Sequence, residues 1–446
     1  MTSTTKEIKK KIIMRAWRSC AIALLAAVGC CAQQSDAGSG DVVVQPSATL
    51  TSQILDHDFV NYFLFGNGTY DTNLPVIRNG ASTYGGAFGW DVGGGVTASH
   101  SFKGGEFSLS YRGDYRHYNS NGYGNGNTQN LSLLFNKQLS RRWAVGFSLG
   151  GGILEYGGSF YSMEPTNAST DITNPLASRS RFASAGVNVT YSQTRRLSYV
   201  FSGAGFYSSY NYSGAARSLG GTGTASVQYR TTARTTIGGT YSHSYYTYSS
   251  NFGSSTIDGG FLTLSHMFSG HWSANLSAGE THSHSQGTIT LPVTLLLGQQ
   301  LVSGYITGPY NRSANTPSFQ LGVSHYLKRS SVSLTGGQGV NAGNGTYLTS
   351  KDQFVTLTLS FSHRLSNFGL GGSYFRLTSI ANTVSNTYSS ANFSASYGYT
   401  LKKYIALNFR YDFIHYDNFY ALQGVNESRV SLGVSFSSKS VPLTLF

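Results

Sequence analysis

The strongest constraint on this chain is a long succession of segments in which apolar and polar residues alternate with a period of two. The clearest pair spans 128–140 and 142–156. In the first of these segments, Leu131, Leu133 and Phe135 share one face, and mostly polar residues occupy the other. This alternation predicts β-strands with one apolar and one polar side. The tight break between the two segments predicts that they form an antiparallel hairpin.

The same hairpin pattern repeats along the chain. Short turns and long polar segments alternate as the connections between successive strands. Eight short turns are predicted at 103–105, 140–142, 194–196, 231–233, 269–270, 328–330, 366–367 and 402–403. Nine longer loops are predicted near 67–85, 119–127, 157–179, 211–218, 248–256, 286–315, 343–352, 380–387 and 417–426. This alternation predicts eighteen strands, from about 57–66 to about 427–438, with both chain ends at the short-turn side. Because the first strand and the segment 286–315 have the weakest patterns, sixteen and twenty strands remain open.

Composition decides which kind of β-protein this is. Only 11% of the residues are charged, against about 25% in ordinary soluble domains. No run of about 20 apolar residues is present, so a membrane-spanning helix is not expected. A strand of about 13 residues, tilted by about 40°, rises about 33 Å, which crosses an outer-membrane core of about 25 Å. A secreted soluble sandwich or solenoid is the alternative, but such folds expose more Lys and Glu on shorter strands.

Two further observations favour a barrel in a membrane. All eight Pro residues lie in the predicted loops, strand starts or tails, as expected because Pro cannot donate to a paired sheet. Aromatic residues such as Trp143, Trp272 and Tyr404 crowd the short turns. A ring of aromatics at one height is typical of the interfacial girdle of a membrane barrel.

In this pattern the region from about 57 to 446 resembles porin-like outer-membrane β-barrels of Gram-negative bacteria. The resemblance implies an all-β, transmembrane antiparallel up-and-down β-barrel over residues 57–438. It also implies insertion into outer-membrane lipid by the barrel-assembly machinery, which reads a C-terminal strand ending on Phe. Phe446 is the last residue, but Pro442 interrupts the segment 439–446, so Phe436 is an equal candidate for that signal. Residues 439–446 are therefore either a tail or the end of the last strand.

The N-terminus has the pattern of a secretory signal peptide. Basic residues precede the apolar run 21–29, and the small residues Cys30 and Ala32 suit cleavage after Ala32. An alternative is a lipobox at 27–30 with Cys30 lipidated, although the usual Leu three residues before the Cys is absent. We expect residues 1–32 to be the signal peptide and 33–56 a flexible periplasmic leader.

The positive charge of the chain does not indicate nucleic-acid binding. The total is +13, and removal of the +5 carried by residues 1–32 leaves +8 on the mature chain. This excess is spread along the sequence and lies partly in tight turns. Because no basic helix or ribbon is present, a nucleic-acid partner is not expected.

Charged residues on the predicted inner face are few, and they fall on strands that a closed barrel brings together. They lie on the second and third strands and on the last two. Opposed charges in a narrow lumen select permeating solutes, and the alternative is a set of ion pairs that holds the closure seam together, each worth little. The lumen selectivity candidates are Asp91, Arg112, Asp114, Arg116, Arg410, Asp412, Glu427 and Arg429.

The segment 286–315 is too apolar for a loop in water, with Leu291, Val293 and Leu295 among its residues. One hypothesis is that it folds into the lumen as a constriction or partial plug. The alternatives are an extended hairpin above the membrane, two extra strands, or a contact between protomers.

Other chemistry has weak support in the sequence. Glu280, His282 and His284 alternate on one strand face, where metal ligands could converge, but the phase of the strand puts them outward. Glycine runs such as 93–95 are not phosphate loops, because no helix follows them. No nucleophile-elbow motif is present, so we expect no catalytic residues, no metal and no cofactor.

The sequence therefore predicts an outer-membrane channel for passive diffusion of small polar solutes or saccharides through a polar lumen. An 18-stranded barrel is wide enough for an aqueous channel. Two alternatives stay open: a conduit for exopolysaccharide export, and a plugged surface barrel with an adhesive or hydrolytic role. The sequence identifies neither the solute nor the oligomeric state.

Overall fold

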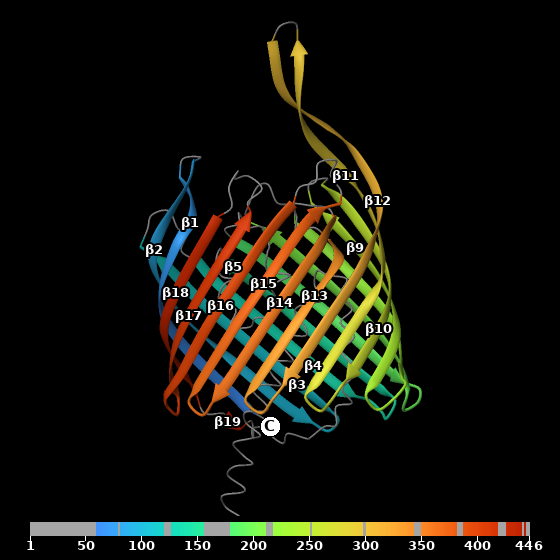
Figure 1. The fold of residues 1–446 in the computed structure, drawn as a ribbon, viewed down its shortest axis with the longest axis vertical. Helices are drawn as coiled ribbons and strands as arrows, with labels where there is room; N and C mark the ends of the chain where they lie inside the picture. Colours follow the sequence, from blue (N-terminus) through green and yellow to red (C-terminus); the bar gives the residue numbers. More distant parts are fainter. Residues whose placement is uncertain are drawn as a thin grey trace, which may run out of the picture.

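Each alternating segment of the sequence forms a strand that pairs with its neighbours in the chain (Figure 1). The structure, a computed structural model, describes residues 59–78, 81–119, 126–155, 179–210, 217–249, 252–297, 300–342, 349–380, 387–417, 425–438 and 441–442. The predicted signal peptide, the leader 33–56 and Phe446 lie outside these residues.

The strands of the described residues, in chain order, are β1 (Phe59–Arg78), β2 (Ala81–Phe102), β3 (Gly105–Tyr118), β4 (Gly126–Gln138), β5 (Trp143–Glu155), β6 (Arg179–Ser192), β7 (Leu197–Tyr210), β8 (Ser218–Arg230), β9 (Thr235–Tyr248), β10 (Gly253–Met267), β11 (Trp272–Leu297), β12 (Gln300–Tyr326), β13 (Ser330–Ala342), β14 (Thr349–His363), β15 (Ser366–Ser379), β16 (Thr387–Lys402), β17 (Ile405–Asp417), β18 (Val425–Ser437) and β19 (Val441–Pro442).

The sheet closes because β1 pairs with both β2 and β18. The closing register runs from Phe63 opposite Ser437 to Asp71 opposite Arg429, and every pairing is antiparallel. The described residues thus form a closed up-and-down barrel of eighteen strands, as the sequence predicts. The short strand β19 lies within the segment 439–446 and pairs with Phe59 and Val60 at the start of β1.

Several of the predicted connections are wrong in detail. The loop expected at 67–85 is strand for most of its length, because the pairing of β1 with β2 continues as far as Arg78 opposite Ala81. The turn expected at 366–367 lies at 364–365, since His363 pairs with Ser366. Ser and Asn are typical turn residues, which is why the sequence favoured the later position. Arg364 adopts a φ of 43° to close this turn.

The two faces of the wall differ in the way that a barrel in lipid requires. Outward side chains are apolar and exposed, with Leu262 at 76%, Phe88 at 66% and Leu432 at 62%. Inward positions on the same strands are mostly Gly, Ser and Thr. Such an apolar outer belt suits a membrane, where closure of the sheet pairs every backbone group. Within the described residues, no helix is long and apolar enough to span a bilayer.

The predicted loop 286–315 forms a β-hairpin that continues β11 and β12 beyond the rim. The two strands pair without interruption from Trp272 opposite His325 to Leu297 opposite Gln300. Figure 1 shows this hairpin standing above the barrel, away from the lumen. The hypothesis of a plug folded into the lumen is therefore wrong for this structure. The extended hairpin is the alternative that the pairing supports.

Beyond the last pair of β12 with β13, β13 and β14 contact β10 directly. The pairing of β12 with β13 ends at Phe319 opposite Gln338. Above that point the hydroxyl of Thr349 on β14 lies 2.8 Å from that of Ser255 on β10. Tyr246, Tyr248, Ile257 and Val340 form a small buried cluster. These contacts join β9, β10, β13 and β14 near the long-loop end.

Inward aromatic rings recur opposite glycines. Phe65 pairs with Gly93, and a Cβ at Gly93 would lie 2.6 Å from the Phe65 ring. Tyr246 pairs with Gly220 in the same way, with its ring 2.4 Å from where that Cβ would be. These glycines therefore make room for aromatic rings that lie flat on the inner wall, which explains the glycine run 93–95 without a ligand.

Candidate functional site

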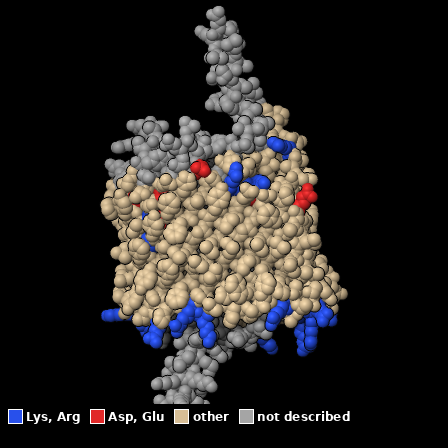
Figure 2. Space-filling model, in the orientation of Figure 1, with Lys and Arg blue, Asp and Glu red and all other residues tan. Residues whose placement is uncertain are grey.

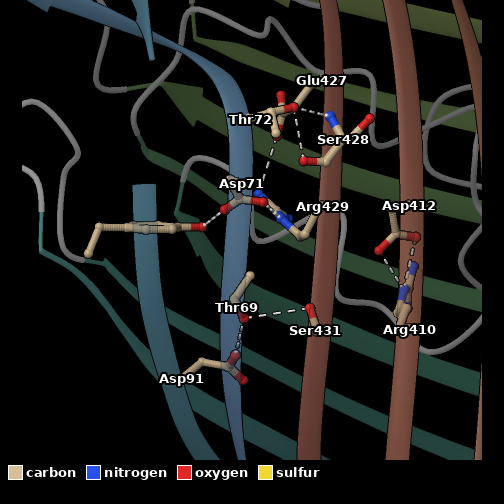
Figure 3. A network of polar contacts seen from close by, with 11 residues as sticks. Thr69, Asp71, Thr72, Asp91, Arg410, Asp412, Glu427, Ser428, Arg429 and Ser431 are labelled. Carbon is tan, nitrogen blue, oxygen red and sulfur yellow. Dashed lines mark hydrogen bonds and ion pairs between the residues drawn. The ribbon is translucent and has the colours of Figure 1, made fainter. Parts of the chain in front are cut away.

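The eight candidate lumen residues lie together on one arc of the inner wall. They come from β2, β3, β17 and β18, and β1 completes the five neighbouring strands. Figure 3 shows Asp91, Arg410, Asp412, Glu427 and Arg429 beside Asp71 and Thr69 of β1. The adjacency predicted from the closure of the barrel is therefore present in the structure.

The most buried part of this arc is an ion-pair network across the closure seam. Arg429 of β18 donates from Nε to Asp71 of β1, and both side chains are almost completely buried. The Tyr118 hydroxyl donates to the other oxygen of Asp71, and Arg429 also lies 3.4 Å from Glu427. The network therefore ties the first strand of the barrel to the last strand and to β3.

Asp91 belongs to a second group of contacts, one layer closer to the short turns. The Asn67 amide donates to Asp91 at 2.7 Å, and the Thr69 hydroxyl lies 3.4 Å from the same carboxylate. Thr69 also lies 3.5 Å from Ser431 of β18. Arg116 is buried and stands opposite Asp91 in the register of β2 and β3. Asp91 is thus held among polar side chains from three strands.

Arg410 and Arg112 differ from the rest of the arc because they are partly exposed. Arg410 donates from Nε to both oxygens of Asp412, at 2.8 and 2.9 Å. Arg112 lies 4.0 Å from Asp114 and stacks over the Phe65 ring at 4.7 Å. The Arg410 and Arg112 side chains are 23% and 27% exposed, whereas their acidic partners are 6% and 5% exposed.

This arrangement assigns different residues to the two roles considered from the sequence, which are a charged surface in the lumen and ion pairs that hold the closure seam. The carboxylates of Asp114 and Asp412 are almost completely buried, so within these two ion pairs the exposed surface belongs to the side chains of Arg112 and Arg410. The Asp71–Arg429 pair is closed off from the lumen and holds the seam. A seam lock and a charged lumen surface can therefore coexist in one arc, formed by different residues.

Sequence reasoning missed three residues of this site: Asp71, Tyr118 and Phe65. Asp71 was placed in a loop because the first strand was ended at 66. The alternation of Asn67, Thr69 and Asp71 continues the inward phase of β1, and that signal could have extended the strand. Phe65 could not be found from polarity, because it is an apolar residue on the polar side of the wall.

Glu280, His282 and His284 face outward on β11, as predicted. His282 contacts Asn315, and His284 lies 2.9 Å from the Ser313 hydroxyl. No group of three or more His, Cys, Asp or Glu with metal-binding geometry is found among the described residues.

Comparison with known proteins gives structural similarity only. No family model and no curated protein matches the chain. Solved structures that resemble it include OccK5 (OpdH) of Pseudomonas aeruginosa, with 11% identity over 85% of this chain and 98% of that one, at a TM-score of 0.39. A BenF-like porin from Pseudomonas fluorescens has 12% identity over 85% and 99% of the two chains, at a TM-score of 0.42. Values this low carry no argument about function.

Proposed function

We propose that this protein is an outer-membrane channel through which small hydrophilic solutes diffuse passively. The observation that carries the proposal is the distribution of polarity over a closed wall of eighteen strands. Its outer face is an apolar belt, and its inner face consists mostly of uncharged polar side chains. Barrels of this strand number are wide enough for an aqueous channel, and a lumen lined by Ser, Thr and Asn suits water and sugars.

The charged arc adds charge selection to this channel. Arg112 and Arg410 present positive charge to lumen water, while Asp114 and Asp412 beneath them are nearly inaccessible. Rings and arcs of fixed charge select ions by sign in other pores. We therefore expect the channel to favour anions over cations of equal size.

An outer-membrane channel also needs a signal for export and a signal for assembly into the membrane. Residues 1–32 direct the chain across the inner membrane and are removed, and residues 33–56 lead into β1. Phe436, the penultimate residue of β18, supplies the aromatic end of the assembly signal. Its ring lies 6.2 Å from that of Tyr62 on β1 and 6.4 Å from that of Tyr404, within the aromatic girdle.

The test is the single-channel conductance of the refolded chain in a planar bilayer. Steady steps are expected, and sugars of graded size added to the bath should reduce the conductance until they are too large to enter. A barrel that inserts correctly but stays silent would overturn the proposal. It would favour a gated export conduit or a plugged surface barrel instead.

A further inference from the structure

Basic residues concentrate at the short-turn rim of the barrel. Seven of the eight short turns carry Lys or Arg, and none of the eight contains Asp or Glu. Four of them place two basic residues side by side, at 141–142, 195–196, 328–329 and 402–403. Figure 2 shows blue side chains along this lower rim, whereas both signs of charge are present near the upper rim. We call the basic residues of these seven turns the basic collar.

The collar lies at a defined depth, because lipid-facing aromatic residues flank it. Trp143 directly follows Arg142 and is 44% exposed, and Tyr399 precedes Lys402 by three residues and is 40% exposed. Aromatic girdles lie at the boundary between hydrocarbon and headgroups. Side chains one to three residues beyond the girdle therefore lie at the depth of the lipid phosphates.

Some residues of the collar contact the barrel, since Arg234 donates to the Phe268 carbonyl oxygen and Lys403 lies over the Tyr404 ring. The two arginine pairs of the collar differ from these residues. Arg141, Arg142, Arg195 and Arg196 are exposed and take part in no ion pair in the described part of the chain. Several positive charges at one height, without acidic neighbours, repel one another unless an external anion compensates them. Short turns of membrane barrels face the periplasm, so the anion must come from that side.

We propose that the basic collar binds the phosphate headgroups of anionic phospholipids in the periplasmic leaflet of the outer membrane. Basic residues at a membrane surface attract anionic lipids, and Arg forms paired hydrogen bonds to phosphate. The collar extends around the perimeter from the β2–β3 turn to the β16–β17 turn and is interrupted only at the β10–β11 turn. A soluble anionic macromolecule would call for a patch on one side, whereas a surrounding annulus of lipid matches a ring.

Tryptophan quenching by brominated lipids tests this proposal by comparing two positions on the same barrel. Trp143 lies beside the collar, and Trp90 faces lipid toward the long-loop end with the same exposure of 44%. Two refolded chains each keep one of them as the only Trp, the others being replaced by Phe. Each is reconstituted in vesicles that contain equal amounts of phosphatidylglycerol and phosphatidylcholine, with bromine on the acyl chains of only one lipid.

For Trp143 we expect brominated phosphatidylglycerol to quench about threefold more effectively than brominated phosphatidylcholine at low salt. For Trp90 the two lipids should quench about equally. The fourfold variant Arg141→Gln, Arg142→Gln, Arg195→Gln, Arg196→Gln should bring the Trp143 ratio close to that of Trp90. Its folded fraction, measured by the shift of the unheated band on a gel, confirms that the barrel still forms.

Equal quenching of Trp143 by the two lipids would overturn the proposal, as would a Trp143 preference that the fourfold variant retains. A third outcome would also overturn it: no lipid preference, but salt-sensitive binding of a soluble polyanion such as polyphosphate that the fourfold variant loses. In that case the collar would serve a soluble partner instead of lipid.

Discussion

Burial separates two kinds of charged residue on the inner wall. Asp71 and Arg429 are buried against each other across the seam, 358 residues apart in the chain. Arg112 and Arg410 keep about a quarter of their side chains in contact with lumen water. The first pair is therefore expected to act on stability, and the second on permeation.

The exposed arginines should control ion selectivity. Arg112→Ala or Arg410→Ala removes a positive charge from the lumen surface, so the permeability ratio of chloride to potassium should fall by about two- to fivefold. The measurement is the reversal potential across a bilayer in a salt gradient. Arg141→Ala, which removes a charge from a short turn, is the control and should have a much smaller effect. Equal shifts in all three variants would argue against a constriction at the arc.

The Asp71–Arg429 pair should contribute more to the stability of the barrel than Glu427 does. Asp71→Asn leaves Arg429 without its buried carboxylate and weakens the contact with Tyr118, so the free energy of unfolding should fall by about 3 to 5 kcal/mol. Glu427→Gln should cost less than about 2 kcal/mol, because Glu427 contacts Arg429 only at 3.4 Å. Urea unfolding in lipid vesicles measures both. If Glu427→Gln proved as damaging as Asp71→Asn, the seam would depend on the whole cluster instead of the Asp71–Arg429 pair.

At the scale of single elements, the β11–β12 hairpin is the main departure from a regular barrel. Its outer part pairs only with itself, while β13 lies against β10 and β11, and Thr349 of β14 contacts Ser255 and Ser285. An isolated two-stranded ribbon contributes little to stability in water. The outer part of the hairpin can therefore be removed without opening the wall.

Shortening this hairpin should leave the pore unchanged. Ile289 and Gly308 face each other in the register, so an Asn-Gly turn can join them in place of residues 290–307. The shortened chain should fold and give the same single-channel conductance as the full chain. A clear increase in conductance would mean that the segment enters the lumen after all.

At the scale of the whole molecule, the two ends of the barrel differ in loop length and in charge. Short basic turns lie at the end where β1 begins and β18 ends, and the longer connections lie at the other end. This difference predicts a single orientation in the outer membrane, with the long connections outside the cell.

Cysteine labelling can test that orientation. With Cys20, Cys30 and Cys31 replaced by Ser, a single Cys is placed at Asn119, next to a long connection, or at Arg195, in a short turn. Both positions are exposed. A large maleimide reagent that cannot pass the barrel should label Asn119→Cys on intact cells, and Arg195→Cys only after the outer membrane is opened. The reverse pattern would contradict the proposed orientation.

Period-2 alternation and turn residues are local properties, so the sequence predicts about eighteen strands, their two faces and chain ends on the short-turn side, with sixteen and twenty strands left open until β1 is seen to pair with β18. It also determined that Asp91, Arg112 and Arg410 belong to one arc, because strand order and closure follow from the parity of the turns. The sequence did not reveal that Asp71 pairs with Arg429 across the seam, that Phe65 lies against Arg112, or that the segment 286–315 extends β11 and β12 beyond the barrel. These features depend on register and burial between strands that are distant in sequence, and a local pattern carries no information about either.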